Sequence, residues 1–283
     1  MSGTLYLVAT PIGNLEDITL RALRILRLVD VIAAEDTRRT AQLLAHFGIE
    51  TKMVSCHQHN QQTRIPELVG RLRSGESVAV VSDAGTPGIA DPGLELVQAC
   101  VAAGITVDAL PGASAVLTAA VLSGFSTGDL TFLGFPPHRG IDRTRWIESL
   151  SGRPGTLVLL ESPHRILSCL SGIALTSADR PMMVGRELTK LHQTLYRGTA
   201  SEIAQQIGQP KGEFTVVLGP WRPDAGPRVP LSPGAAVIEL GDITKTLGLG
   251  KRAALAELAR RHGIRPNEAY QLVEQAKSVS DDQ

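Results

Sequence analysis

One segment of the sequence is rich in the residues that build rigid ligand-binding loops. Between Ser82 and Gly93 the chain has three glycines and two prolines, directly after an apolar run. Glycine lets a ligand approach the main chain closely, and proline removes freedom from the loop before binding. A tight turn with a helix cap needs only two or three such residues. We therefore interpret this segment as a loop that binds a ligand through exposed backbone amides.

A second turn of this kind lies at residues 110–115, with the sequence Leu-Pro-Gly-Ala-Ser-Ala. It follows another apolar run and precedes a predicted helix, whose N-terminus offers free backbone amides. A Pro-Gly pair before a helix is common, so this turn alone is weak evidence. In open α/β sheets ligands bind at the carboxyl ends of the strands, and two such turns at one sheet edge predict a ligand site there.

Several familiar motifs are missing from the sequence. The first turn, Thr10–Asn14, lacks the G-x-G-x-x-G of dinucleotide folds, and neither a P-loop nor a G-x-S-x-G nucleophile elbow occurs. Cys56, His57 and His59 lack a second clustered pair of ligands, and no H-E-x-x-H is present. Nicotinamide, P-loop, serine-hydrolase and metal chemistry therefore have little support, and no metal is expected.

Residues 161–165 bring an acid, a hydroxyl, an imidazole and a guanidinium together after an apolar run. Such a segment is equally typical of a capped helix start and of a functional turn. Both interpretations stay open at this point.

The elements that must position these turns alternate between apolar runs and amphipathic segments through residues 1–123. This alternation is typical of a parallel sheet with helical crossovers, and predicts an α/β domain with a doubly wound sheet. The expected strands are residues 5–9, 29–34, 77–81 and 105–110.

Residues 124–128 break the pattern and are interpreted as a linker. A second α/β domain is expected over residues 129–220, and its short, turn-punctuated runs favour a mixed sheet. Its expected strands lie near residues 132–135, 156–160, 182–184 and 214–218.

Five prolines between Pro220 and Pro233 indicate a second linker before a C-terminal helical module, residues 234–283. A helix over residues 251–262, ended by Gly263, and a second helix opened by Pro266 resemble a helix-turn-helix. Residues 241–270 hold six basic and three acidic side chains. Contact with phosphates and an ordinary solvated hairpin fit this module equally well.

The composition limits how the chain can interact with polyanions. Its 28 basic and 28 acidic residues balance, so binding of RNA requires local basic patches. Besides the C-terminal module, one such patch surrounds Trp146. It consists of Arg139, Arg143, Arg145 and Arg153.

Three separate cysteines in no CxxC pair favour a reducing compartment. The segment Met1–Val8 lacks the features of a secretory signal, and no apolar run approaches the ~20 residues of a membrane span. We expect a soluble cytoplasmic protein.

Taken together, these segments resemble the tetrapyrrole-methylase superfamily, and more closely its ribosomal RNA small-subunit methyltransferase I branch. The resemblance spans residues 4 to about 219 in order, and the string Ser-Asp-Ala-Gly-Thr-Pro is its most specific part. The matching segments are residues 8–14, 34–38, 81–93, 110–115, 161–165, 186–190 and 212–217.

The resemblance implies two α/β domains with S-adenosylmethionine in the cleft between them, in a homodimer. It implies methylation of the ribose 2′-oxygen of a cytidine in the decoding region of 16S rRNA, within the small ribosomal subunit. The cofactor contacts that it implies are Pro11, Asp83, Gly85, Thr86, Pro87, Ile89, Pro111, Gly112, Ser114 and Ala115, with Leu160 and Val184 from the second domain.

A ribose hydroxyl is a poor nucleophile, so a positioned base is expected to help, by ~10²–10⁴-fold. The candidates are Asp36, Glu187 and Lys190, with Arg186 and Arg38 orienting phosphates beside the reacting ribose. Lys190 must be neutral to act as a base, which requires burial or a cationic neighbour such as Arg186. The remaining substrate contacts are expected from Glu161, His164, Arg165, Arg139, Arg143, Arg145, Lys251 and Arg252.

Two alternatives remain beside this hypothesis. A methylase of precorrin or uroporphyrinogen would share the fold and the cofactor, although the basic C-terminal module argues against it. A catalytically silent RNA-binding factor would share the fold alone, and Asp36 and Glu187 argue weakly against that.

Overall fold

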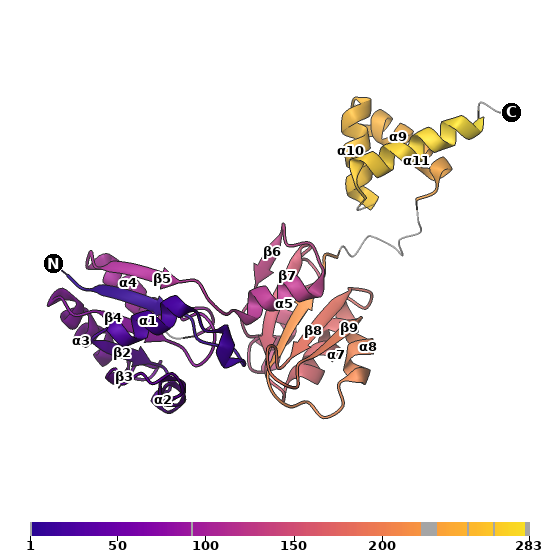
Figure 1. The fold of residues 1–283 in the computed structure, drawn as a ribbon. Coiled ribbons are helices and arrows are strands. Elements are labelled where there is room, and N and C mark those ends of the chain that lie inside the picture. The colour runs from indigo at the N-terminus through magenta and orange to yellow at the C-terminus, as the bar shows by residue number, and fades with distance from the viewer. Residues whose placement is uncertain (1, 92, 222–230, 248, 263, 281–283) are drawn as a thin grey trace. The chain divides into compact units, whose positions relative to one another are not determined.

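The computed structural model describes the chain apart from residues 1, 92, 222–230, 248, 263 and 281–283, and apart from the side chains of residues 246–247, 260–261 and 277–280 (Figure 1). It divides into two compact units, residues 1–222 and 223–283. Most of the proline-rich linker expected over residues 220–233 lies outside the described part. The predicted limits of three domains, residues 1–123, 129–220 and 234–283, stay predictions.

The first sheet has five parallel strands in the order β3-β2-β4-β1-β5 (Figure 1). The strands are β1 (Thr4–Val8), β2 (Val31–Ala34), β3 (Met53–Ser55), β4 (Val78–Val81) and β5 (Thr106–Leu110). The helical segments around them are η1 (Leu15–Asp17), α1 (Leu20–Leu28), α2 (Thr37–His46), α3 (Gln61–Arg73) and α4 (Leu94–Ala102).

Every residue of β2 and β4 is buried, as expected of parallel strands covered on both faces. Ile32 packs with residues of α1 and α2 on one face, whereas Val31 packs with residues of α3 and α4 on the other. The prediction of a doubly wound parallel sheet is confirmed. The strand β3 was not predicted, because it has three half-buried residues and no continuous apolar run.

The second sheet has the order β6-β7-β10-β8-β9, and only β6 and β7 are parallel. The prediction of a mixed sheet is therefore confirmed, although its edge strand β9 was not predicted. The strands are β6 (Leu130–Phe132), β7 (Thr156–Glu161), β8 (Met182–Arg186), β9 (Thr194–Gly198) and β10 (Phe214–Leu218). The helices between these strands are α6 (Gly140–Glu148), α7 (Ile166–Thr176) and α8 (Ala200–Gln206).

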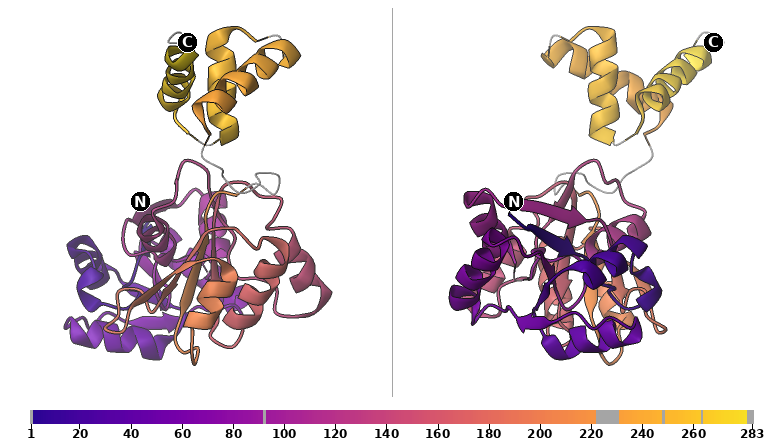
Figure 2. Two further views of the ribbon diagram at one scale, coloured as in Figure 1. Left: turned by 90° about the vertical axis from the view of Figure 1, so that its right-hand side faces the viewer. Right: turned by 60° about the vertical axis from the view of Figure 1, so that its left-hand side comes forward.

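The helix α5 (Ala115–Ser123) joins the first sheet to the second. Ser114 caps its N-terminus after β5, and Val116, Ala119 and Ala120 pack on the second sheet against side chains such as Val158. The opposite face of that sheet packs on α6, α7 and α8. Figure 2 shows the two sheets from two further directions. The turn before α5 therefore lies where both sheets can contribute to one site.

The described residues of the second unit form the helices α9 (Pro233–Leu247), α10 (Lys251–His262) and α11 (Pro266–Ser280). The two helices predicted from the sequence are present with the predicted starts, whereas α9 was not predicted. Its core includes Ala236 and Ile243 of α9 and Leu258 of α10. His262 Nε2 lies 2.6 Å from Glu239 Oε2 and links α10 to α9. Within the described part of the chain, no helix has both the length and the hydropathy of a transmembrane span.

Candidate active site

The first turn and the glycine-rich loop are joined at the carboxyl edge of the first sheet. Thr10 and Gly85 exchange two backbone hydrogen bonds of 2.9 Å each. The Thr10 hydroxyl donates a further hydrogen bond to the Ser82 carbonyl at 3.1 Å. Gly85 has a φ of +80°, which an L side chain rarely adopts. The first turn and the glycine-rich loop therefore form one continuous surface.

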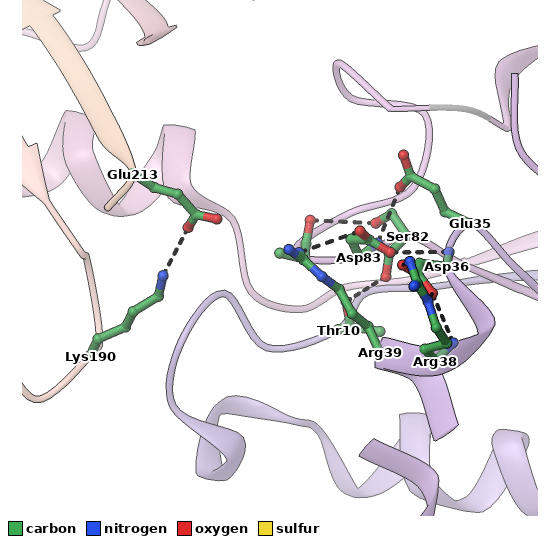
Figure 3. A network of polar contacts seen from close by, with 10 residues as sticks. Thr10, Glu35, Asp36, Arg38, Arg39, Ser82, Asp83, Lys190 and Glu213 are labelled. Carbon is green, nitrogen blue, oxygen red and sulfur yellow. Dashed lines mark hydrogen bonds and ion pairs between the residues drawn. The ribbon is translucent and has the colours of Figure 1, made fainter. Parts of the chain in front are cut away.

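Asp83 connects this loop to the start of α2 (Figure 3). Its carboxylate accepts a hydrogen bond from the Asp36 backbone N–H at 3.1 Å and lies 3.3 Å from Arg39 Nη1. The Asp83 N–H in turn donates to Glu35 Oε2 at 3.2 Å. These contacts fix the position of the Asp83 carboxylate before any ligand arrives.

Three acids gather at this loop. Burial, followed by the charges of Glu35 and Asp83, raises the pKa of Asp91 to about 7. Burial also raises the pKa of Glu35. Carboxylates whose charge is costly in the free protein favour a cationic ligand, because a cation removes their mutual repulsion. Asp91 was not singled out from the sequence, although it is the one acid within the glycine-rich loop besides Asp83.

Asp91 makes stability depend on pH. The ordinary pKa of an aspartate is ~3.9, so between pH 4 and pH 7 the unfolded chain loses a proton that folded Asp91 keeps. The resulting stability is complete below about pH 4 and is lost as the pH rises through about 7. We expect the urea midpoint to fall from pH 5 to pH 8 by more in the wild-type protein than in Asp91→Asn. Equal falls in the two proteins would show that Asp91 does not keep its proton.

A cavity of about 330 Å³ opens beside the loop, and we call it the first cavity. Its walls come from the carboxyl edge of the first sheet, the start of α5 and the second sheet. Of the implied cofactor residues, seven line it, namely Asp83, Gly85, Thr86, Ile89, Ser114, Ala115 and Leu160.

The other implied cofactor residues lie elsewhere. Pro11 lines a neighbouring cavity, whereas Pro87, Pro111 and Gly112 line neither. A Cβ at Gly112 would lie 2.6 Å from the Ala9 Cβ, so this glycine allows close packing of β1 and the turn. Val184 is fully buried in the core of the second sheet, so its side chain does not reach the cavity.

The neighbouring, second cavity has a volume of about 450 Å³. It shares Ile12, Arg39, Asp83, Ala84 and Glu213 with the first cavity. Its other lining residues are Thr10, Pro11, Gly13, Leu15, Thr40, Gln42, Leu43, Ser82 and Lys190.

The turn after β8 reaches this second cavity. Glu187 and Thr189 have φ values of +52° and +66°, a strained conformation for side chains other than glycine. Lys190 Nζ lies 2.9 Å from Glu187 Oε1 and 3.1 Å from Glu213 Oε2. A Cβ at Gly13 would lie 2.4 Å from the Lys190 Cγ, so the first turn packs directly on this turn.

The charges around Lys190 contradict one part of the base hypothesis. Burial lowers the pKa of Lys190. The hydrogen bonds and charges of Glu187 and Glu213 outweigh the effect of burial, so that the pKa of Lys190 is raised overall. Arg186 is not among the groups that shift the pKa of Lys190, and its Nε donates to the Lys211 carbonyl at 2.8 Å. The expectation that a cationic neighbour keeps Lys190 neutral is therefore wrong for the free protein.

The other two base candidates are also held as anions. Asp36 caps α2 through the Arg38 N–H and pairs with the Arg38 guanidinium at 2.9 Å, which together lower its pKa to about 2. Burial raises the pKa of Glu187, but the hydrogen bond from the Glu213 N–H and the contact with Lys190 lower this pKa overall. The Arg38 side chain is 88% exposed and lines neither cavity.

Glu161 is held in a buried ion-pair group. Its side chain is fully buried, with Arg143 Nη2 at 2.8 Å and Arg165 Nε at 3.0 Å. Both arginines were expected to contact the substrate. In the structure they pair with Glu161 and connect α6 to the end of β7. The exposed side chains of His164, Arg139 and Arg145 line neither cavity, and their substrate role stays a prediction.

On α10, Lys251 and Arg252 are exposed, and Lys251 Nζ lies 3.7 Å from Glu274 Oε1. Their role in binding RNA also stays a prediction. Within the described ranges, no group of three His, Cys, Asp or Glu residues could hold a metal ion.

A family model described as Tetrapyrrole (Corrin/Porphyrin) Methylases matches residues 4–204, which include the residues joined at the first-sheet edge. The chain belongs to the tetrapyrrole methylase family. Membership confirms the resemblance found in the sequence and the expectation of a methyltransferase.

Curated relatives place this tetrapyrrole methylase among proteins named ribosomal RNA small subunit methyltransferase I. The relative from Synechocystis sp. is 42% identical over 95% of this chain and 97% of its own length. The relative from Pseudomonas aeruginosa is 40% identical over 99% of both chains. The relative from Thermotoga maritima is 48% identical over 76% of this chain and 98% of its own.

Solved structures confirm the fold of this tetrapyrrole methylase. Diphthine synthase matches with a TM-score of 0.59 at 17% identity, over 77% of this chain and 90% of that one. Uroporphyrin-III C-methyltransferase from Thermus thermophilus, solved with S-adenyl homocysteine, matches with a TM-score of 0.55 at 19% identity, over 77% and 97%.

Proposed function

We propose that the chain transfers a methyl group from S-adenosylmethionine to the ribose 2′-oxygen of a cytidine in 16S rRNA of the small ribosomal subunit. The observation that carries this proposal is the similarity to curated rRNA small subunit methyltransferases I, at 40% identity along 99% of the chain. S-adenosylmethionine is the methyl donor. When bound, it supplies a methyl group activated on a sulfonium.

The first cavity fits this donor in its charges and its walls. Asp83 and Asp91 line it, and a cationic ligand stabilises the ionised form of both carboxylates. Gly85, whose positive φ disfavours any other residue, has no side chain and lets a ligand approach the loop closely. The apolar side chains of Ile12, Ile89 and Leu160 provide contact area.

Positioning supplies most of the proposed acceleration. Methyl transfer forms an O–C bond while the S–C bond breaks, so donor and acceptor must lie in line. Cavities that share walls hold two ligands side by side. The hydroxyl proton passes to a carboxylate of the group formed by Glu187, Lys190 and Glu213, because Glu213 lines the second cavity, whereas Asp36 lines neither cavity.

Assembly as a homodimer and a location in the cytoplasm belong to the same proposal. The outer face of α5 exposes Leu117 and Val121, which are 60% and 75% accessible, as a self-association surface would be in a single copy. Analytical ultracentrifugation is expected to give twice the mass of one chain, and a monomer at micromolar concentration would contradict the dimer.

The activity can be tested by transfer of a labelled methyl group. Small ribosomal subunits from cells lacking the protein are expected to accept the label on a cytidine of 16S rRNA, identified by mass mapping of nucleotides. Uroporphyrinogen is the control acceptor and is expected to stay unlabelled. Label on uroporphyrinogen alone would indicate a tetrapyrrole methylase, and donor binding without conversion to S-adenosylhomocysteine would indicate a silent RNA-binding factor.

A further inference from the structure

The second cavity is placed to receive the acceptor. It shares five lining residues with the first cavity, so a ligand in one lies against the walls of the other. In-line transfer requires reacting atoms ~3–3.5 Å apart, which only adjoining sites allow. At about 450 Å³ the second cavity is also within the range of small-ligand sites.

Two cationic side chains line the second cavity, and they differ in how fully their charge is neutralised. Lys190 lies within 3.1 Å of two carboxylates, and its side chain is 30% exposed. Arg39 is 63% exposed, and among the described residues its one ion-pair partner is Asp83, 3.3 Å from Nη1. A guanidinium has five N–H donors, so Arg39 keeps donors for a further anion. In Figure 3 its side chain extends toward the side where Lys190 and Glu213 lie.

The neutral lining suits a nucleotide better than a free anion. Leu15 is 39% exposed and Leu43 is half-buried, and both offer apolar area to a base. Gln42 is exposed, and its amide can donate and accept hydrogen bonds. Thr10, Thr40 and Ser82 also line the second cavity, and these three residues are buried.

We propose that the second cavity binds the acceptor nucleotide, and that Arg39 binds the phosphate beside the reacting ribose. This inference rests on the proposed RNA substrate, and it names the cavity that receives the nucleotide and the residue that binds its phosphate. Arg39, and not Arg38 as the sequence suggested, is then the residue of α2 that contacts the phosphate. Because Arg39 pairs with Asp83 at the wall common to both cavities, the arriving phosphate competes with Asp83 for the guanidinium.

The test compares Arg39→Gln with Arg73→Gln, an exposed arginine of α3 that lines neither cavity. The acceptor is the unmodified small ribosomal subunit, studied at several salt concentrations. Loss of one charge-assisted phosphate contact is expected to raise the KM for subunits ~10- to 100-fold. The slope of log affinity against log salt is expected to become shallower by ~0.7–0.9. Arg73→Gln is expected to behave as wild type.

Two further measurements separate this role from a structural one. Because Arg39 also lines the first cavity and pairs with Asp83, calorimetry is expected to give a loss of affinity of Arg39→Gln for S-adenosylmethionine much smaller than the ~10- to 100-fold rise in KM, and binding of the donor also shows that the variant is folded. Arg39→Lys keeps the charge and is expected to restore the salt slope. An unchanged KM and slope in Arg39→Gln, or a loss of donor affinity by the same factor, would overturn the assignment.

The failure of the proposed function is distinguishable from the failure of this inference. If the wild-type chain does not methylate subunits, the proposed activity is wrong. Retention of labelled subunits by the protein on filters then still tests the phosphate contact, through the same change in salt slope.

Discussion

Replacing Ala115 with phenylalanine is expected to abolish binding of S-adenosylmethionine while leaving the fold intact. Ala115 is the first residue of α5, is half-buried and lines the first cavity. A phenyl ring there occupies space that the donor needs, in a cavity of about 330 Å³. We expect affinity to fall by at least ~100-fold, which corresponds to ~2.7 kcal/mol. Isothermal titration of the variant measures this loss.

The matched control is Ala102→Phe, at an exposed position of α4 that lines neither cavity. It adds the same ring and is expected to bind the donor as wild type does. If Ala115→Phe also titrates as wild type does, the donor does not occupy the first cavity.

Replacing Arg180 with methionine is expected to produce the largest loss of stability. Arg180 is fully buried, and its guanidinium donates to the carbonyls of Gly219, Leu150 and Gly155 at 2.7–2.8 Å. Burial lowers its pKa to about 10, so it stays charged at neutral pH. Methionine removes the donors of three carbonyls at once, so the free energy of unfolding should fall by ~3–5 kcal/mol.

Urea denaturation of Arg180→Met and of Arg24→Met checks this expectation. Arg24 is exposed on α1, and its replacement is expected to cost less than ~0.5 kcal/mol. Equal stability of the two variants would show that the buried guanidinium does not hold these three segments together.

The parts of the fold that the sequence predicts are those with continuous apolar runs. The runs that form β2 and β4 are buried on both faces, so their sequences alone indicate a covered parallel sheet. The edge strands β3 and β9 are only half-buried and have no such signal. Helix α9 lies in the module that was expected to be helical, although its own bounds were not predicted.

The site was predictable where it depends on local loops and not where it depends on distant partners. Glycine and proline spacing identifies the 82–93 loop because backbone conformation is a local property. By contrast, Glu161 pairs with Arg143 from another element, which no spacing reveals. Arg38 and Arg39 differ in direction by ~100° on a helix, so only the start of α2 decides which one reaches the cavities.

Glu213 shows a second limit of prediction from sequence. Its side chain is 67% exposed and it directly precedes β10, yet it lines both cavities and pairs with Lys190. Its segment was part of the family resemblance, but no charge pattern around it indicates a partner 23 residues away. Only the antiparallel pairing of β10 with β8 brings the two side chains together.

Binding of the methyl donor is the step on which the remaining proposals depend. Isothermal titration of the purified wild-type chain with S-adenosylmethionine, and separately with S-adenosylhomocysteine, measures it directly. We predict saturable binding of both at one site per chain, and loss of both in Ala115→Phe. Absence of heat with either ligand, confirmed by equilibrium dialysis, would contradict the assignment of the first cavity as the donor site.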